Sequence, residues 1–115
     1  MVPADWIEHR RQADGELVGW VRPDGDAWVA LSMLGRPVSA AVDWIDAERA
    51  LDELGLGFLA GVWTLQSPSG PLDVRIVHVA PGGIVVQTDD FGAIDAPVER
   101  FELPWPAPPT LQPRD

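Results

Sequence analysis

Three short turn sequences constrain the fold of this chain more than any other feature. The motifs RPDGDA, SPSGP and APGG each lie between two apolar runs, at residues 22–27, 67–71 and 80–83. Proline and glycine in such positions are typical of tight hairpin turns between neighbouring strands. Short connections join antiparallel strands, whereas parallel strands need long crossovers. The sequence therefore predicts a mostly antiparallel sheet, or a partly closed barrel, of five to seven strands.

The pattern at residues 43–55 predicts the main helix. In the segment DWIDAERALDELG, Asp43 has the position of an N-cap, and Gly55 suits the residue after the helix. Apolar residues recur at the spacing of one helical face: Trp44, Ala47, Leu51 and Leu54. A helix at 44–54 beside antiparallel strands makes the predicted fold class α+β.

The tripeptide Asp-Trp-Ile occurs twice, in ADWIEHRRQADG and in VDWIDAERALDELG. In the first copy, Asp5 and Glu8 have the spacing of a capping box. This spacing predicts a shorter N-terminal helix at about residues 5–14. Strand-like sequence with glycine and tryptophan follows both copies, so an internal helix-plus-hairpin duplication, 5–31 and 43–80, is a hypothesis.

Around RPDGDA, a four-residue loop would place Trp20 beside Val29 on one face and Val21 beside Trp28 on the other. Both faces are then apolar and need a cover. Around APGG, pairing of Ala80 with Gly83 places Val77 and Val79 on the drier face with Ile84 and Val86, and Val74, Ile76 and His78 on the other.

The 115 residues fit one domain, which we expect at 1–103. Five prolines lie between Pro104 and Pro113, so residues 104–115 are predicted to form an extended proline-rich tail. No apolar run approaches the roughly 20 residues of a membrane span, and the N-terminus lacks the features of a secretory signal. The absence of cysteine fits the same expectation, which is a cytoplasmic protein without membrane partners.

Charge and composition exclude several functions. Eighteen carboxylates against eight arginines give a net charge of −10, which repels nucleic-acid phosphates, so we expect no nucleic-acid partner. The sequence has no lysine, and therefore no P-loop and no Schiff base. No serine lies in a G-x-S-x-G motif, and PDGD lacks the spacing of a calcium loop.

The remaining candidates for chemistry are carboxylates and two histidines. Asp73, His78, Asp89 and Asp90 form the densest group, but the predicted register separates His78 from Asp73. A solvated strand end is favoured over a metal site, and His9 fits an exposed helix. No catalytic residue, cofactor or metal is therefore predicted.

Tryptophans with nearby carboxylates are the candidate residues for binding a ligand or partner. Among six tryptophans, Trp28 and Trp105 are the least committed to a core, and Asp24 and Asp26 adjoin Trp28. Exposed aromatic residues are enriched at interfaces. We therefore place the candidate partner site at Asp24, Asp26, Trp28 and Trp105.

Three groups of residues carry a resemblance to a known family: Gly15-Glu16-Leu17 with Gly19-Trp20, Leu34-Gly35-Arg36-Pro37, and Val74-Arg75-Ile76. With the strings around them, they make nearly the whole chain similar to a family of small uncharacterised actinobacterial proteins. That family has no established activity. The resemblance implies a shared fold and a bacterial source, and it implies no functional residue.

Three functions remain open from the sequence. The first is a non-catalytic interaction module or accessory protein in the cytoplasm. The second is an acidic neutraliser of a basic protein, as immunity proteins or nucleic-acid mimics are. The third is a small carboxylate- or metal-dependent hydrolase, although a chain of this size has little room for a substrate cleft.

Overall fold

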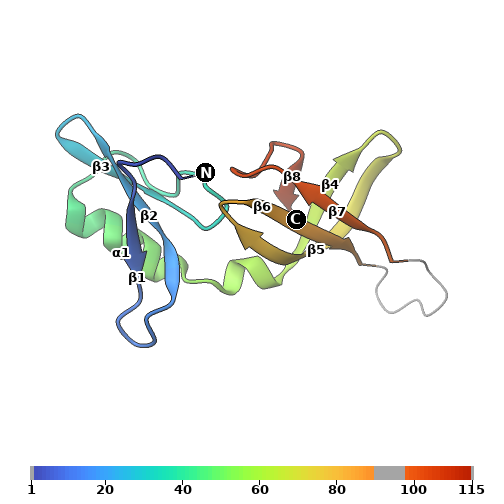
Figure 1. Cartoon of the computed structure of the whole chain (residues 1–115), viewed down its shortest axis with the longest axis horizontal. Helices are drawn as coiled ribbons and strands as arrows, with labels where there is room; N and C mark the ends of the chain where they lie inside the picture. The colour runs from blue at the N-terminus through green and yellow to red at the C-terminus, as the bar shows by residue number, and fades with distance from the viewer. Residues whose placement is uncertain (1, 90–97, 115) are drawn as a thin grey trace. The chain divides into compact units, whose positions relative to one another are not determined.

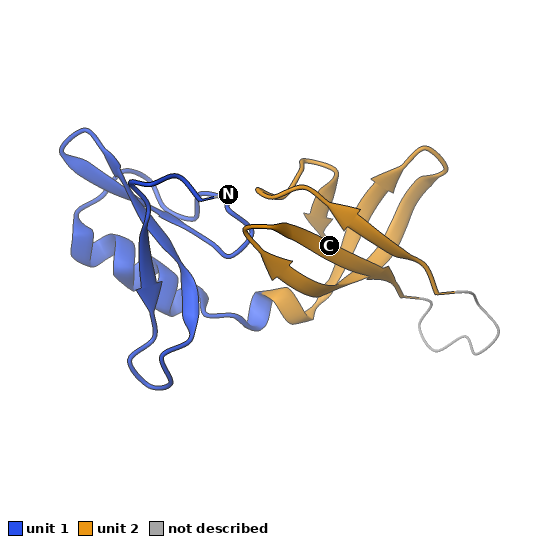
Figure 2. Ribbon diagram, in the orientation of Figure 1, with its two compact units in different colours: residues 1–58 blue, residues 59–115 orange. Residues whose placement is uncertain are grey.

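The computed structural model describes residues 2–89 and 98–114. The chain divides into two compact units, residues 1–58 and 59–115, which are shown in two colours in Figure 2. All described strand pairs are antiparallel, and they form two open sheets of three and five strands. The predicted α+β class is confirmed, but the described strands number eight and form no partly closed barrel. In the described residues, no helix has the length and apolar character to cross a membrane.

The first unit contains the smaller sheet and the main helix. Its strands are β1 (Ile7–Arg10), β2 (Leu17–Asp24) and β3 (Ala27–Leu31), in the order β1-β2-β3. Helix α1 spans Trp44–Leu54, as predicted (Figure 1). The Asp43 carboxylate accepts a hydrogen bond from the Asp46 amide, and Gly55 ends the helix at a φ of 62°.

The predicted N-terminal helix is wrong, because residues 7–10 form β1. Ile7 lies opposite Val21, and His9 lies opposite Gly19. The backbone of this segment therefore pairs with β2 and does not form the hydrogen bonds of a helix. The first Asp-Trp-Ile therefore leads into a strand and the second into α1. The helix-plus-hairpin duplication is wrong for the same reason, since its first copy has no helix.

The β2–β3 hairpin has the predicted faces but a different register. Asp24 pairs with Ala27 across a two-residue turn, so Trp20 lies opposite Leu31. A shift of two residues keeps each side chain on its face. A β-bulge at Val18 then brings Val18 and Val21 to the same side, against α1.

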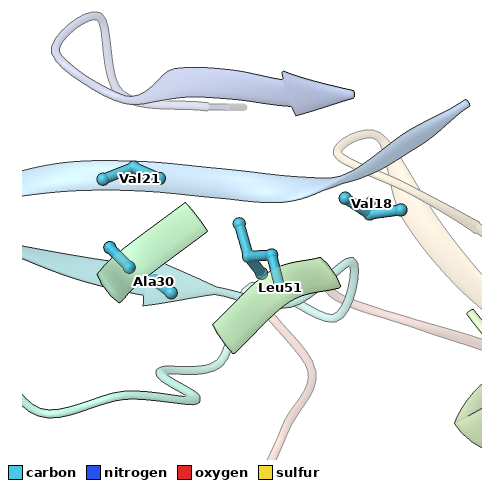
Figure 3. Packing of buried hydrophobic residues seen from close by; sticks show 5 residues of the cluster. Val18, Val21, Ala30 and Leu51 are labelled. Atoms are coloured by element: carbon cyan, nitrogen blue, oxygen red, sulfur yellow. The ribbon is translucent and has the colours of Figure 1, made fainter. Parts of the chain in front are cut away.

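The core of the first unit lies between the sheet and α1. Figure 3 shows Val18, Val21, Ala30 and Leu51 converging there, and all are fully buried together with Ala47. The opposite face of the sheet carries Trp20, which is 2% exposed and lies 6.2 Å from the Trp6 ring. Both apolar faces are thus buried, as the sequence required.

The second unit is a five-stranded sheet. After the 3-10 helix η1 (Gly57–Ala60) come β4 (Val62–Ser67), β5 (Gly70–Ala80), β6 (Gly83–Thr88), β7 (Arg100–Leu103) and β8 (Leu111–Pro113). The order is β7-β6-β5-β4-β8. The proline-rich segment contributes β8, which pairs with β4. The predicted domain boundary between residues 103 and 104 stays a prediction.

A β-bulge in β5 changes the faces that the sequence predicted. Ala80 pairs with Gly83 as expected, but Val77 is the extra residue between the pairs His78–Val85 and Ile76–Val86. The bulge turns Val74 and Ile76 to the side of Ile84 and Val86 and leaves Val77 47% exposed. The buried residues of this unit include Trp63, Leu65, Val74, Ile84, Val86, Trp105 and Leu111.

Candidate functional site

The residues predicted to bind a partner are divided between the two units. Trp28 is half-buried and packs edge-on against Trp44, with ring centroids 4.9 Å apart. Asp24 and Asp26 are exposed at the adjoining hairpin turn. Trp105 belongs to the second unit and is 9% exposed. Their binding role stays a prediction, and Trp28 contacts the start of α1 through Trp44.

The structure brings His9 into a polar cluster that sequence reasoning missed. Its side chain is 13% exposed, and both ring nitrogens contact carboxylates of α1. Nδ1 lies 3.1 Å from Glu48 Oε2, and Nε2 lies 2.8 Å from Asp52 Oδ1. Because Glu48 and Asp52 are four residues apart, they lie on one face of the helix. The sequence predicted a helix at residues 5–14 with His9 on its solvated surface, so this cluster was not expected.

The geometry at His9 does not suit metal or base chemistry. The two ring nitrogens point away from each other, so Glu48 and Asp52 cannot join the imidazole around a single ion. Each ring nitrogen also lies within 3.1 Å of a carboxylate oxygen, so neither faces an open site. Among residues 2–89 and 98–114, no group of three or more potential ligands could hold a metal ion. The cluster instead fastens β1 to α1.

Removal of the His9 side chain tests this structural role. His9→Ala leaves Glu48 and Asp52 without their shared partner, and we expect a loss of about 1–2 kcal/mol in the free energy of unfolding. His78→Ala removes the other histidine, which is exposed on β5, and should cost under about 0.5 kcal/mol. Urea denaturation of both variants measures the difference, and equal stabilities would contradict the role of His9.

A pocket of about 420 Å³ adjoins His9 in the first unit. Arg10 and Arg11 line it together with the two helix carboxylates. Both arginines are engaged within their own turn: Arg10 donates to the Gly15 carbonyl at 3.1 Å, and Arg11 donates twice to the Asp14 carboxylate at 3.2 and 2.7 Å. The pocket therefore presents paired charges rather than a cationic anion site.

Asp14 provides a pH-dependent contribution to the stability of this turn. A hydrogen bond from the Glu16 amide, and then the Arg11 side chain, hold the pKa of Asp14 below its ordinary value of 3.8. A carboxylate with a lowered folded pKa stabilises the fold above its unfolded pKa, and this stabilisation is lost as the pH falls through the folded pKa. Asp14→Ala should therefore lower the melting temperature at neutral pH, and the difference from the unchanged protein should narrow below about pH 4. A difference that is constant with pH would contradict this ionisation effect.

On the second sheet, Asp73 and Asp89 of the predicted acidic group each form an ion pair with an arginine. Asp89 lies 2.8 Å from the Arg75 Nε, and Asp73 lies 3.6 Å from the Arg114 Nε. The β5 bulge corrects the predicted separation, since it places His78 on the same face as Arg75 and Asp73. Asp90, which the sequence prediction included, lies outside the described residues. A second pocket, of about 360 Å³, lies beside His78 and Glu102 at the turn between β5 and β6.

Comparison with known proteins identified no relative of this chain. No protein-family model, curated protein or solved structure matches the chain. The resemblance to small uncharacterised actinobacterial proteins thus stays a prediction.

The exposed face of α1 is the surface with the most distinctive chemistry in the first unit. Ile45 is 66% exposed, more than any other large apolar residue among those that the structure describes. Four carboxylates lie on the same side of the helix or at its borders: Asp46, Glu48, Asp52 and Glu53. The only cation among residues 44–54 is Arg49, which pairs with Asp46 at 3.1 Å.

Proposed function

We propose that this protein is a non-catalytic interaction module of the cytoplasm that binds a basic protein through the exposed face of α1. The observation that carries the proposal is Ile45, an exposed aliphatic side chain among carboxylates. Ile45, Arg49 and Asp52 are spaced three and four residues apart, so they share one side of the helix. An apolar anchor with a charged rim is the usual organisation of a protein interface.

Charge favours a basic partner and disfavours nucleic acid. The first unit has eleven carboxylates against five arginines, so its field attracts cationic surfaces and repels phosphate. A partner with an apolar socket bordered by arginine or lysine would bury Ile45 and neutralise the surrounding carboxylates. The acidic-neutraliser function is thus a specific form of this proposal, in which the bound protein is inactivated.

The predicted residues of the β2–β3 turn extend the proposed surface. Trp28 packs on Trp44, which directly precedes Ile45 in the chain. Asp24 and Asp26 would therefore add two carboxylates near the start of the helix. Trp105 is not part of this proposed surface, because its side chain is only 9% exposed.

Affinity capture from a lysate of the source organism tests the proposal with a matched pair of variants. Ile45→Ser removes the apolar anchor, whereas Val38→Ser removes an exposed aliphatic side chain, 38% exposed, outside α1. A basic protein should be captured by the unchanged chain and by the Val38 variant and remain bound at high salt. The Ile45 variant should bind it about tenfold more weakly, as expected for loss of an interface anchor.

Two outcomes would overturn the proposal. The first is capture that is equal for both variants, which would remove α1 from the interface. The second is capture that disappears with moderate salt for every variant, because attraction between exposed charges alone is screened.

A further inference from the structure

Within residues 59–89 and 98–114, β7 has a partner strand on one edge only. β7 is the last strand of the order β7-β6-β5-β4-β8, and among the described residues only β6 pairs with it. The opposite edge is the three-residue strand β8, which ends in Pro113 and suits pairing less well. An open edge presents N–H and C=O groups that a further strand can bind.

The register fixes which residues of β7 present these groups. The Thr88 amide donates to the Glu99 carbonyl at 2.9 Å, so the backbone of Glu99 points toward β6. Alternate residues of an antiparallel strand point the same way. Phe101 and Leu103 therefore also bond toward β6, and Arg100 and Glu102 direct their N–H and C=O groups outward.

The side chains on this edge are complementary to a second copy of the same strand. When two antiparallel copies of β7 pair with Phe101 opposite Phe101, Arg100 of each copy lies opposite Glu102 of the other. Both residues are exposed on the same face of the sheet, so the two facing pairs join opposite charges. A shift of two residues would instead place Arg100 opposite Arg100 or Glu102 opposite Glu102.

We propose that the protein forms a symmetric homodimer through antiparallel pairing of β7 with β7. The outward backbone groups of Arg100 and Glu102 meet those of Glu102 and Arg100 in the second copy, giving about four hydrogen bonds. The two Phe101 residues form a pair without backbone hydrogen bonds, in which facing side chains approach most closely. The two five-stranded sheets become one continuous sheet of about ten strands.

An apolar contact outside the strand supports the same register. Val98 is 60% exposed. Continuation of the pairing places it opposite Pro104 of the second copy, so both lose exposed surface on association. The interface is short and each chain carries a charge of −10, so the dimer should form only at high protein concentration.

Sedimentation equilibrium with charge-reversal variants tests the proposal. The unchanged chain should shift from monomer to dimer between about 10 µM and 1 mM, a range suited to weak association. Arg100→Glu and Glu102→Arg each place like charges in both facing pairs, so each variant alone should remain monomeric. An equal mixture of the two variants restores opposite charges in both pairs and should recover the dimer.

Two further variants separate edge pairing from general charge effects. Arg49→Glu on α1 changes the net charge as much as Arg100→Glu does, and it should leave the dimer intact. Glu102→Pro removes an outward N–H that β6 does not use, so it should keep the fold, as judged by circular dichroism, and lose the dimer. A monomeric unchanged chain at about 1 mM, or a mixture of the charge variants that stays monomeric, would overturn the proposal.

Discussion

Gly19→Ala should unfold much of the first unit at temperatures where the unchanged protein is stable. A Cβ atom at this position would lie 2.1 Å from the Leu31 carbonyl oxygen and 2.9 Å from Leu51 Cδ2. The backbone φ of 153° is also one that residues with side chains rarely adopt. Since a backbone atom cannot move aside cheaply, we expect a loss of about 4 kcal/mol, at the upper end for single substitutions.

The measurement is thermal unfolding followed by tryptophan fluorescence, with Gly57→Ala as the control. Gly57 has no heavy atom within 4 Å of the added Cβ, so its variant should melt close to the unchanged protein. A loss of about 4 kcal/mol corresponds to a fall of about 20 °C for a small domain. A Gly19 variant that melts like the control would mean that β2 does not approach β3 and α1 as closely as the structure describes.

Leu51→Ala should cost about 3 kcal/mol, because it leaves a cavity where α1 meets the sheet. Leu51 is fully buried with Val18, Val21 and Ala30. The control lies on the same helix: Ile45→Ala truncates a side chain that is 66% exposed and should change stability by under about 0.5 kcal/mol. Urea denaturation distinguishes these outcomes, and similar losses for both variants would contradict the assigned faces of α1.

The two substitutions should also be coupled. Removal of the Leu51 side chain eliminates one of the contacts that hinder Ala at position 19, but the Leu31 carbonyl remains. The double variant should therefore lose less stability than the sum of the single losses, by about 0.5 kcal/mol or more, without regaining the stability of either single variant. Simple additivity would show that Gly19 and Leu51 do not meet.

Local signals in the sequence predicted the elements that depend on nearby residues. Helix α1 was predicted to the residue because Asp43 and Gly55 determine its ends within the segment itself. All three turns were also confirmed as hairpins, since proline and glycine fix the backbone there. Only the two-residue length of the β2–β3 turn was missed, and this error shifted the register without exchanging the faces.

The errors arose where distant residues decide the local structure. The segment after Asp5 has a plausible helical cap, yet pairing with β2 makes it a strand. The bulge at Val77 has no recognisable sequence signal, and the bulge at Val18 is marked only by the adjacent Gly19. Each bulge exchanges the faces of the residues beyond it. The His9 cluster could not be predicted from local signals alone. Such signals predict α1, but His9 reaches Glu48 and Asp52 only because pairing with the distant β2 makes residues 7–10 a strand.

The division of the chain into two contiguous units has a consequence for folding during synthesis. Every strand pair of the first unit lies within residues 7–31, and α1 completes its core by residue 54. A ribosome that adds residues from the N-terminus therefore synthesises the first unit's strands and helix before it makes β4. In the second unit, Leu65 of β4 pairs with Leu111 of β8, which is synthesised after the other four strands of this sheet. Addition of β8 to the sheet should therefore be the last pairing step of this unit.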